Sequence, residues 1–219
     1  KLLNMNPDPI PKFVLLKEFK GYQKNSLEYQ NAYNEACKQK LIVNLEQSQN
    51  ERGFWPPFHG YTEGMIRHCV SLGLDNEHPI VKKVINYLEL LIHGKETTNQ
   101  FEKQDNPSWY PMMFEPLIIA SMLSLLNCHN EFAEEQKQLW ARFAEKAFSN
   151  GNYDKDVNAK EQEEHFGFYT KRTIPPFNYY NLLLLAPRND KSYLSANTDK
   201  FLVDYLMNKA KSITYVYNN

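Results

Sequence analysis

Residues 49–60 read Gln-Asn-Glu-Arg-Gly-Phe-Trp-Pro-Pro-Phe-His-Gly and interrupt a chain that is otherwise patterned as helices. The two glycines and two prolines of this stretch are incompatible with a regular helix or strand, so we expect a loop dense in aromatic side chains. Before the loop, Ser26 is expected to cap one long helix that ends near Gln49. The apolar stripe of that helix recurs at every fourth position and comprises Tyr29, Tyr33, Cys37, Leu41 and Leu45.

Further helices are expected before the helix over 26–49 and after the aromatic loop. Asp8-Pro9 supplies an N-cap and a first-turn proline for a helix that Gly21 ends. After the aromatic loop, the pattern predicts a short helix over about 62–72. A longer helix then starts at His78-Pro79 and ends at Gly94.

An internal repeat carries this pattern into the second half of the chain. Trp109 follows Trp55 by 54 positions, and residues 126–131 match residues 72–77 at the same spacing. The second copy contains a helix that starts at Glu115 and is apolar nearly all round, which predicts that it is buried.

The second copy continues with an amphipathic helix over 130–148, which we expect on the outside. A third, weaker copy follows a long polar loop that includes residues 160–177. It consists of a short apolar helix over 177–185 and an amphipathic helix capped by Ser195, and the tail 213–217 alternates like a strand. The prediction is about eight helices in four hairpins, each pairing a short apolar inner helix with a longer amphipathic outer one.

Composition fits one globular domain, 1–219, in which 42% of the residues are hydrophobic. Lys and Arg number 25 against 26 Asp and Glu, so the charge pattern gives no indication of a nucleic-acid partner. The most apolar segment, 116–126, is shorter than the roughly 18 residues of a membrane span, so no stable membrane insertion is expected. The three cysteines form no C-x-x-C pair and no signal-peptide pattern is visible, which predicts a reducing, cytoplasmic location without disulfides.

One motif resembles that of a known superfamily. Leu45-x-x-x-Gln49-x-x-x-Gly53-x-Trp55 is similar to the QW motif of the squalene-hopene cyclase and terpenoid cyclase superfamily. The run from Leu72-Gly73-Leu74 to Pro79 also resembles the repeats of that superfamily. The opening Asp8-Pro9-x-x-Lys12 is similar to the start of small bacterial squalene-cyclase-like proteins of uncharacterised function.

This resemblance implies an α/α toroid, the fold that terpenoid cyclases share with protein prenyltransferases. Four hairpins would form an open arc or a reduced ring, and a homodimer is one arrangement that covers the edge of an arc. Elementary chemistry agrees with the motif: Gly53 permits a closed turn, Trp55 offers a flat packing surface, and the Gln49 amide can join adjacent helix ends.

The acid of the resembling cyclases is an Asp-x-Asp-Asp motif, and here the nearest match is Asp154-Lys155-Asp156-Val157. We expect that segment to be a solvated loop, and cyclase chemistry is therefore not predicted. Aromatic residues in the loops before apolar helices could instead line a pocket for an apolar or isoprenoid molecule, or simply plug the ring. The predicted ligand-binding residues are Trp55, Phe58, His59, Tyr61, Trp109, Tyr110, Phe114, Phe168, Tyr169, Phe177 and Tyr180.

Acid–base chemistry has its own candidates. Glu63 and Glu115 start two corresponding helices, where they either cap the helix or form the paired carboxylates that a glycosidase requires. In the segment 160–177, His165 or Tyr169 could move a proton while Arg172 neutralises a carboxylate, as in a lyase.

Three functions therefore stay open at this point. The first is a squalene-cyclase-like protein that binds an apolar small molecule. The second is a carbohydrate-active lyase or hydrolase, and the third is a non-catalytic helical-repeat protein that binds a partner chain. No metal or cofactor is predicted, because the histidines lack metal-ligand spacing.

Overall fold

The computed structural model describes residues 2–96, 109–126, 129–167, 173–186 and 192–212. Within these ranges all regular secondary structure is helical, which confirms the all-α prediction. The chain divides into two compact units: unit 1 comprises 1–100 with 125–128, and unit 2 comprises 101–124 with 129–219. The toroid arrangement and the single domain stay predictions, and the tail 213–217 lies outside the described residues.

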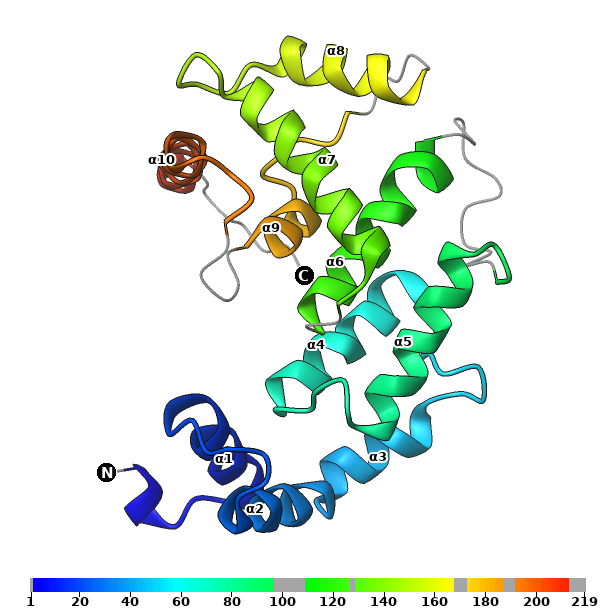
Figure 1. The fold of residues 1–219 in the computed structure, drawn as a ribbon, viewed down its shortest axis with the longest axis vertical. Helices are drawn as coiled ribbons and strands as arrows, with labels where there is room; N and C mark the ends of the chain where they lie inside the picture. The colour runs from blue at the N-terminus through cyan, green and yellow to red at the C-terminus, as the bar shows by residue number, and fades with distance from the viewer. Residues whose placement is uncertain (1, 97–108, 127–128, 168–172, 187–191, 213–219) are drawn as a thin grey trace. The chain divides into compact units, whose positions relative to one another are not determined.

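Unit 1 contains eight helical elements in the part of the chain that the structure describes (Figure 1). In chain order they are a 3₁₀-helix η1 (Leu2–Met5), α1 (Pro9–Val14), a π-helical turn η2 (Leu15–Phe19), α2 (Leu27–Cys37), α3 (Lys40–Ser48), a second π-helical turn η3 (Phe58–Thr62), α4 (Glu63–Ser71) and α5 (Pro79–Ile92).

Most of the predicted start and stop signals in unit 1 act as expected, but the Asp8 side chain makes no capping hydrogen bond at the start of α1. The Ser26 hydroxyl accepts a hydrogen bond from the Tyr29 backbone N–H at 3.3 Å, which caps α2. Gly21 and Gly94 follow the ends of η2 and α5 with φ of +60° and +64°, the left-handed conformation that glycine adopts at helix ends.

The single long helix expected over 26–49 is wrong, because α2 and α3 are separate. Gln39 lies between them in an extended conformation, with φ −68° and ψ 137°. The break changes which side chains face the core: Ile42 and Leu45 are buried, whereas Leu41 is 47% exposed. Residues 38–39 are Lys and Gln, so no glycine or proline marks the break.

The core of the N-terminal part of unit 1 lies between α1 and α2. Phe13 and Leu16 pack there against Tyr29, Ala32 and Ala36. The Phe13 ring stands edge-on to the Tyr29 ring, with 5.3 Å between ring centroids. This hairpin is the scaffold on which the polar groups described below are placed.

Unit 2 carries six helical elements among its described residues (Figure 1). They are a π-helical turn η4 (Tyr110–Phe114), α6 (Glu115–Leu125), α7 (Glu131–Ala147), α8 (Lys155–Phe166), α9 (Tyr179–Leu185) and α10 (Ala196–Ser212). Every residue of α6 from Leu117 to Ser124 is buried, as its apolar sequence predicts. α7 contacts both α8 and α9.

The solvated loop expected at Asp154–Val157 is wrong, and so is the loop expected over 160–177 as far as residue 166, because residues 155–166 form α8. The Asp154 carboxylate accepts hydrogen bonds from the backbone N–H groups of Asp156 and Val157, both at 3.0 Å. Asp154 is therefore an N-cap, and Gly167 in the left-handed conformation ends the helix. The helix was not predicted because its composition is polar. Even its buried face carries the polar residues Asn158 and Gln162.

Corresponding elements recur between the units, at a spacing that differs in part from the sequence match. α4 and α6 start at Glu63 and Glu115, 52 residues apart, and each directly follows a π-helical turn. Their last residues, Ser71 and Leu125, keep the spacing of 54. The described residues contain ten α-helices where about eight were expected.

None of these helices combines the length and the apolar character needed to span a bilayer, as far as the described residues go.

Candidate active site

The structure distributes the predicted site residues over both units. Unit 1 holds Trp55, Phe58, His59, Tyr61 and Glu63, and unit 2 holds Trp109, Tyr110, Phe114, Glu115, His165, Phe177 and Tyr180. Phe168, Tyr169 and Arg172 lie outside the described residues. The two units are described separately, so the expected pairing of Glu63 with Glu115 stays a prediction.

Trp55 and Phe58 are fully buried side chains of unit 1. The indole N–H of Trp55 donates to the Leu45 carbonyl and to the Ser48 hydroxyl, both at 3.2 Å. Phe58 packs against the Tyr87 ring at 6.1 Å between centroids. These contacts give both residues a structural role, and their predicted role in ligand binding stays a prediction.

The aromatic residues at the start of α6 form a cluster with α9. The Trp109 ring stacks on the Phe114 ring at 4.9 Å, and Phe114 stands edge-on to Tyr180 at 5.3 Å. Tyr110 also meets Phe114 edge-on, at 6.1 Å. The structure thus brings four of the predicted residues together inside unit 2.

Phe177 belongs to a different aromatic group. Its ring lies 4.8 Å from that of Tyr153 and 4.7 Å from that of Tyr205. Tyr205 lies on α10, so Phe177 packs the segment before α9 against that helix.

His165 lies near the C-terminal end of α8 and is exposed. A guanidinium N–H of Arg142 donates to its Nδ1 at 3.2 Å. Partial burial and the Arg142 charge both lower the pKa of His165. The imidazole is therefore neutral at neutral pH, with Nδ1 occupied as an acceptor.

His59 and Glu63 form the pair in unit 1 that is best suited to moving a proton. Nδ1 of His59 lies 2.7 Å from Oε1 of Glu63, and the side chains are 34% and 3% exposed. A buried carboxylate that holds one nitrogen of a partly exposed imidazole fixes the orientation of the ring. This arrangement is typical of acid–base sites.

Local backbone geometry brings the two residues together. Glu63 is the first residue of α4, and His59 lies four positions earlier in η3. His59 and Gly60 both depart from helical geometry, and Gly60 has φ of +88°. An alanine would be strained at that φ, so glycine permits the turn that carries His59 back over the helix start.

Two further polar residues belong to the same short segment. Tyr61 lies between His59 and Glu63 in sequence and is 49% exposed. Arg67 is exposed one turn further along α4, and its Nη2 lies 3.8 Å from the place that a Cβ on Gly64 would take. The segment 59–67 therefore contains a base, a carboxylate, a phenol and a guanidinium.

The pair is not repeated at the corresponding helix of unit 2. The residue four positions before Glu115 is Pro111, which offers no side chain that could bond to the carboxylate. His59 and Glu63 were predicted as separate site residues, and their i, i+4 spacing across the helix start is the sequence signal that links them.

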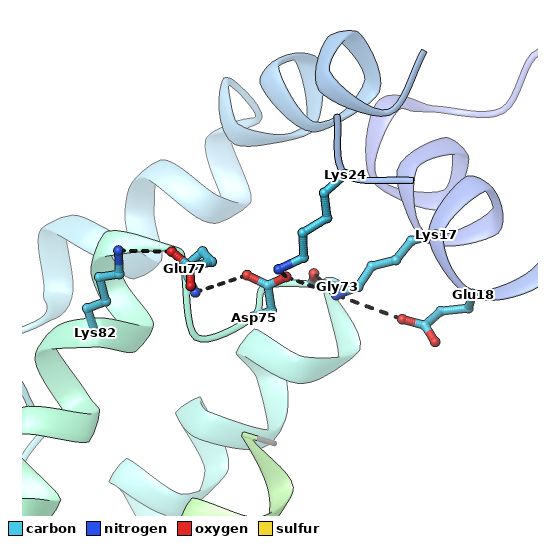
Figure 2. A network of polar contacts seen from close by, with 7 residues as sticks. All are labelled: Lys17, Glu18, Lys24, Gly73, Asp75, Glu77 and Lys82. Carbon is cyan, nitrogen blue, oxygen red and sulfur yellow. Dashed lines mark hydrogen bonds and ion pairs between the residues drawn. The ribbon is translucent and has the colours of Figure 1, made fainter. Parts of the chain in front are cut away.

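Unit 1 contains a second cluster of polar side chains, which no sequence pattern predicted. The Asp75 carboxylate lies 2.9 Å from Nζ of Lys24 and 3.8 Å from Nζ of Lys17 (Figure 2). Lys17 also donates to the Gly73 carbonyl at 2.8 Å. These contacts connect the α1–α2 hairpin with the segment between α4 and α5.

The thiols described in the structure are poor nucleophiles. Burial raises the pKa of Cys69 to about 12 and also raises the pKa of Cys37. The described residues include no group of three or more His, Cys, Asp or Glu side chains that could hold a metal ion.

Comparisons of the chain with protein-family models, with curated proteins and with solved structures gave no match.

Proposed function

We propose that the protein is a carbohydrate-active enzyme of the lyase type, with the His59–Glu63 pair as its proton-transfer centre. The observation that carries the proposal is the 2.7 Å contact between a buried carboxylate and a partly exposed imidazole. The contact holds Nδ1 in place, so Nε2 is the nitrogen that would exchange a proton with a substrate.

The proposed reaction is β-elimination on a uronate-containing polysaccharide. His59 takes the proton from the carbon next to the substrate carboxylate, and the electron pair of that C–H bond forms a carbon–carbon double bond. The glycosidic oxygen then leaves from the β-carbon and takes a proton from Tyr61. Solvent restores the phenol proton and removes the proton from His59, so the enzyme returns to its starting state.

The other groups in the segment suit this reaction. Removal of a proton next to a carboxylate builds negative charge on that carboxylate, which a guanidinium such as Arg67 stabilises. Hydrolysis by two carboxyl groups would need a second acid about 5 to 9.5 Å away. Residues 58–71 contain Glu63 as their one acidic residue, so this segment does not supply such a pair by itself.

An apolar or isoprenoid ligand has less support from the described contacts. Trp55 and Phe58 are committed to packing and to hydrogen bonds within unit 1. Polar side chains also line a large part of the cavities described in this unit.

The test is an assay of the whole chain against polygalacturonate, alginate and hyaluronan. Elimination creates an unsaturated uronate, whose ultraviolet absorbance reports turnover directly. We expect turnover of at least one polymer, and a loss of about 100-fold or more in His59→Gln, the usual range for a general base. Glu63→Gln and Tyr61→Phe should lower kcat while circular dichroism shows a folded protein.

His68→Gln is the matched control, because His68 is a second histidine in this part of the chain, on α4, and has no part in the proposed reaction. It should keep the activity of the unchanged protein. No unsaturated product from any of the three polymers, or full activity in His59→Gln, would overturn the proposal.

A further inference from the structure

A cleft on unit 1 lies away from the His59–Glu63 pair. It has a volume of about 430 Å³ and lies between α2 and the segment 75–77, beyond the C-terminal end of α4. Ligand pockets in proteins commonly measure roughly 300–1,000 Å³. The size of the cleft is therefore that of a small-molecule site.

Charges in the cleft are already balanced by neighbouring charges. Lys24 and Asp75 form an ion pair at 2.9 Å, and Glu77 pairs with Lys82 at 3.2 Å (Figure 2). Burial alone would raise the pKa of Asp75, but hydrogen bonds from Lys24 and from the Glu77 backbone N–H, with the charge of Lys17, lower it. The hydrogen bond to Asp75 raises the pKa of Lys24, so both partners stay charged at neutral pH.

Two amide side chains line the cleft on the α2 side. Gln30 and Asn34 are four residues apart on one face of α2, and both are exposed. Neither side chain makes a hydrogen bond to another residue within the described ranges. Each amide therefore offers a donor and an acceptor to a ligand.

Aromatic surface completes the lining. Tyr33, half-buried, lies between the two amides in sequence, and its ring is nearly parallel to that of Tyr29, with 6.4 Å between centroids and 14° between planes. Burial raises the pKa of Tyr33, so its phenol keeps its proton at neutral pH. Packing of Tyr33 edge-on to Phe13 and His78 holds the ring in place.

We propose that this cleft binds a neutral saccharide. A sugar ring presents hydroxyl groups that donate and accept at once, and these match the amides and the outer oxygens of the ion pairs. Its C–H face can pack on an aromatic side chain. An ionic ligand would have to compete with the Lys24–Asp75 and Glu77–Lys82 pairs, which disfavours a charged compound. The proposal does not rest on the lyase reaction, because it uses none of the residues of that site.

The test is a titration of the ¹⁵N-labelled whole chain with maltose, cellobiose and N,N′-diacetylchitobiose, each in a separate NMR experiment. We expect at least one of them to shift the side-chain amide signals of Gln30 and Asn34 in a saturable manner. Asn34→Ala should then weaken the binding of that sugar about tenfold, the effect of losing one or two hydrogen bonds.

Asn31→Ala is the matched control, because Asn31 is an exposed asparagine on the same helix that lines a different cavity. It should leave the affinity unchanged, as should His59→Gln, which separates this site from the proposed lyase centre. The proposal is overturned if none of the three sugars shifts the two amide signals. It is also overturned if Asn31→Ala weakens binding as much as Asn34→Ala does.

Discussion

The side-chain amide of Gln49 donates to the Ile80 carbonyl at 3.0 Å and to the Gly53 carbonyl at 2.8 Å. Gln49 follows the last residue of α3, and Ile80 lies in the first turn of α5. One side chain thus joins the end of one helix to the start of another. This geometry confirms the expectation that Gln49 ties adjacent helix ends.

Replacement of Gln49 by alanine should lower the free energy of unfolding. The variant loses both hydrogen bonds and leaves the Ile80 and Gly53 carbonyls without this donor, which costs about 1–3 kcal/mol. Urea denaturation followed by circular dichroism measures the loss. Gln47→Ala is the control, because Gln47 is exposed in the last turn of α3 and its replacement should change stability by less than about 0.5 kcal/mol. Equal losses in the two variants would contradict the structural role of Gln49.

Replacement of Gly53 by alanine should lower stability more than the same replacement at Gly94, a second glycine with positive φ. A Cβ at Gly53, where φ is +90°, would lie 2.5 Å from the Lys83 backbone oxygen. Gly94 has φ of +64° and open space around a Cβ, so Gly94→Ala carries only the conformational cost of about 1–2 kcal/mol. Gly53→Ala should lose at least about 1 kcal/mol more, because the backbone of α5 must also move. Thermal or urea unfolding of both variants provides the comparison, and a smaller loss for Gly53→Ala would show that the contact relaxes freely.

Protonation of His78 should lower the stability of unit 1 in mild acid. The side chain is buried, and its Nδ1 caps α5 by accepting from the Ile80 N–H at 3.3 Å. Burial lowers the pKa of His78 below 6.5, against the opposing charges of Glu46 and Asp75. Between the two pKa values the unfolded chain binds more protons than the folded chain. Stability is therefore highest above pH 6.5 and is lost as the pH falls through the folded pKa.

His78→Asn tests this expectation, since asparagine is a good N-cap that does not titrate. The free energy of unfolding should fall more steeply in the unchanged protein than in the variant between about pH 7 and about pH 5. The difference between the two curves isolates His78 from other groups, including the exposed His165, whose pKa is also lowered. Parallel curves would show that His78 does not contribute.

The sequence predicts the helix boundaries that rest on local chemistry. Ser26, His78-Pro79 and Ser195 carry N-cap signals, and helices start next to each of them. The break at Gln39 was not predictable in this way, because no glycine, proline or capping side chain marks it. α8 was missed for a related reason: its buried face uses the polar side chains of Asn158 and Gln162, which an apolar periodicity does not detect.

The sequence was sufficient to predict the residues of the candidate site, but not the contact between them. His59 was predicted to bind a ligand and Glu63 to cap a helix or act as an acid, but their contact depends on the positive φ of Gly60. The cleft between Asn34 and Asp75 was not predictable, because it depends on how α2 folds onto a segment about 40 residues away. Helix caps and turns can be predicted from neighbouring residues in the sequence. Contacts between distant segments cannot, because they depend on how the helices pack.

The Lys24–Asp75 ion pair should contribute a small, salt-sensitive coupling to stability. The Lys24 side chain is largely exposed, so a double-mutant cycle with Lys24→Met and Asp75→Asn should give about 0.2–1 kcal/mol at low ionic strength. Most of that coupling should disappear at about 1 M salt, where the screening length is about 3 Å. Since the folded-state pKa of Asp75 is lowered below 3.8, its contribution is present above that pH and is lost on further acidification.

A second cycle, with Lys17→Met in place of Lys24→Met, separates the Lys24–Asp75 pair from its neighbour Lys17. Lys17 reaches Asp75 at 3.8 Å but donates to the Gly73 carbonyl at 2.8 Å, a contact that needs no carboxylate. Lys17→Met should therefore cost stability in the Asp75→Asn background as well, and that cost should persist at high salt. A Lys24–Asp75 coupling that is equally insensitive to salt would contradict this expectation. It would show that packing of the two side chains, and not attraction between their charges, stabilises this part of the cleft.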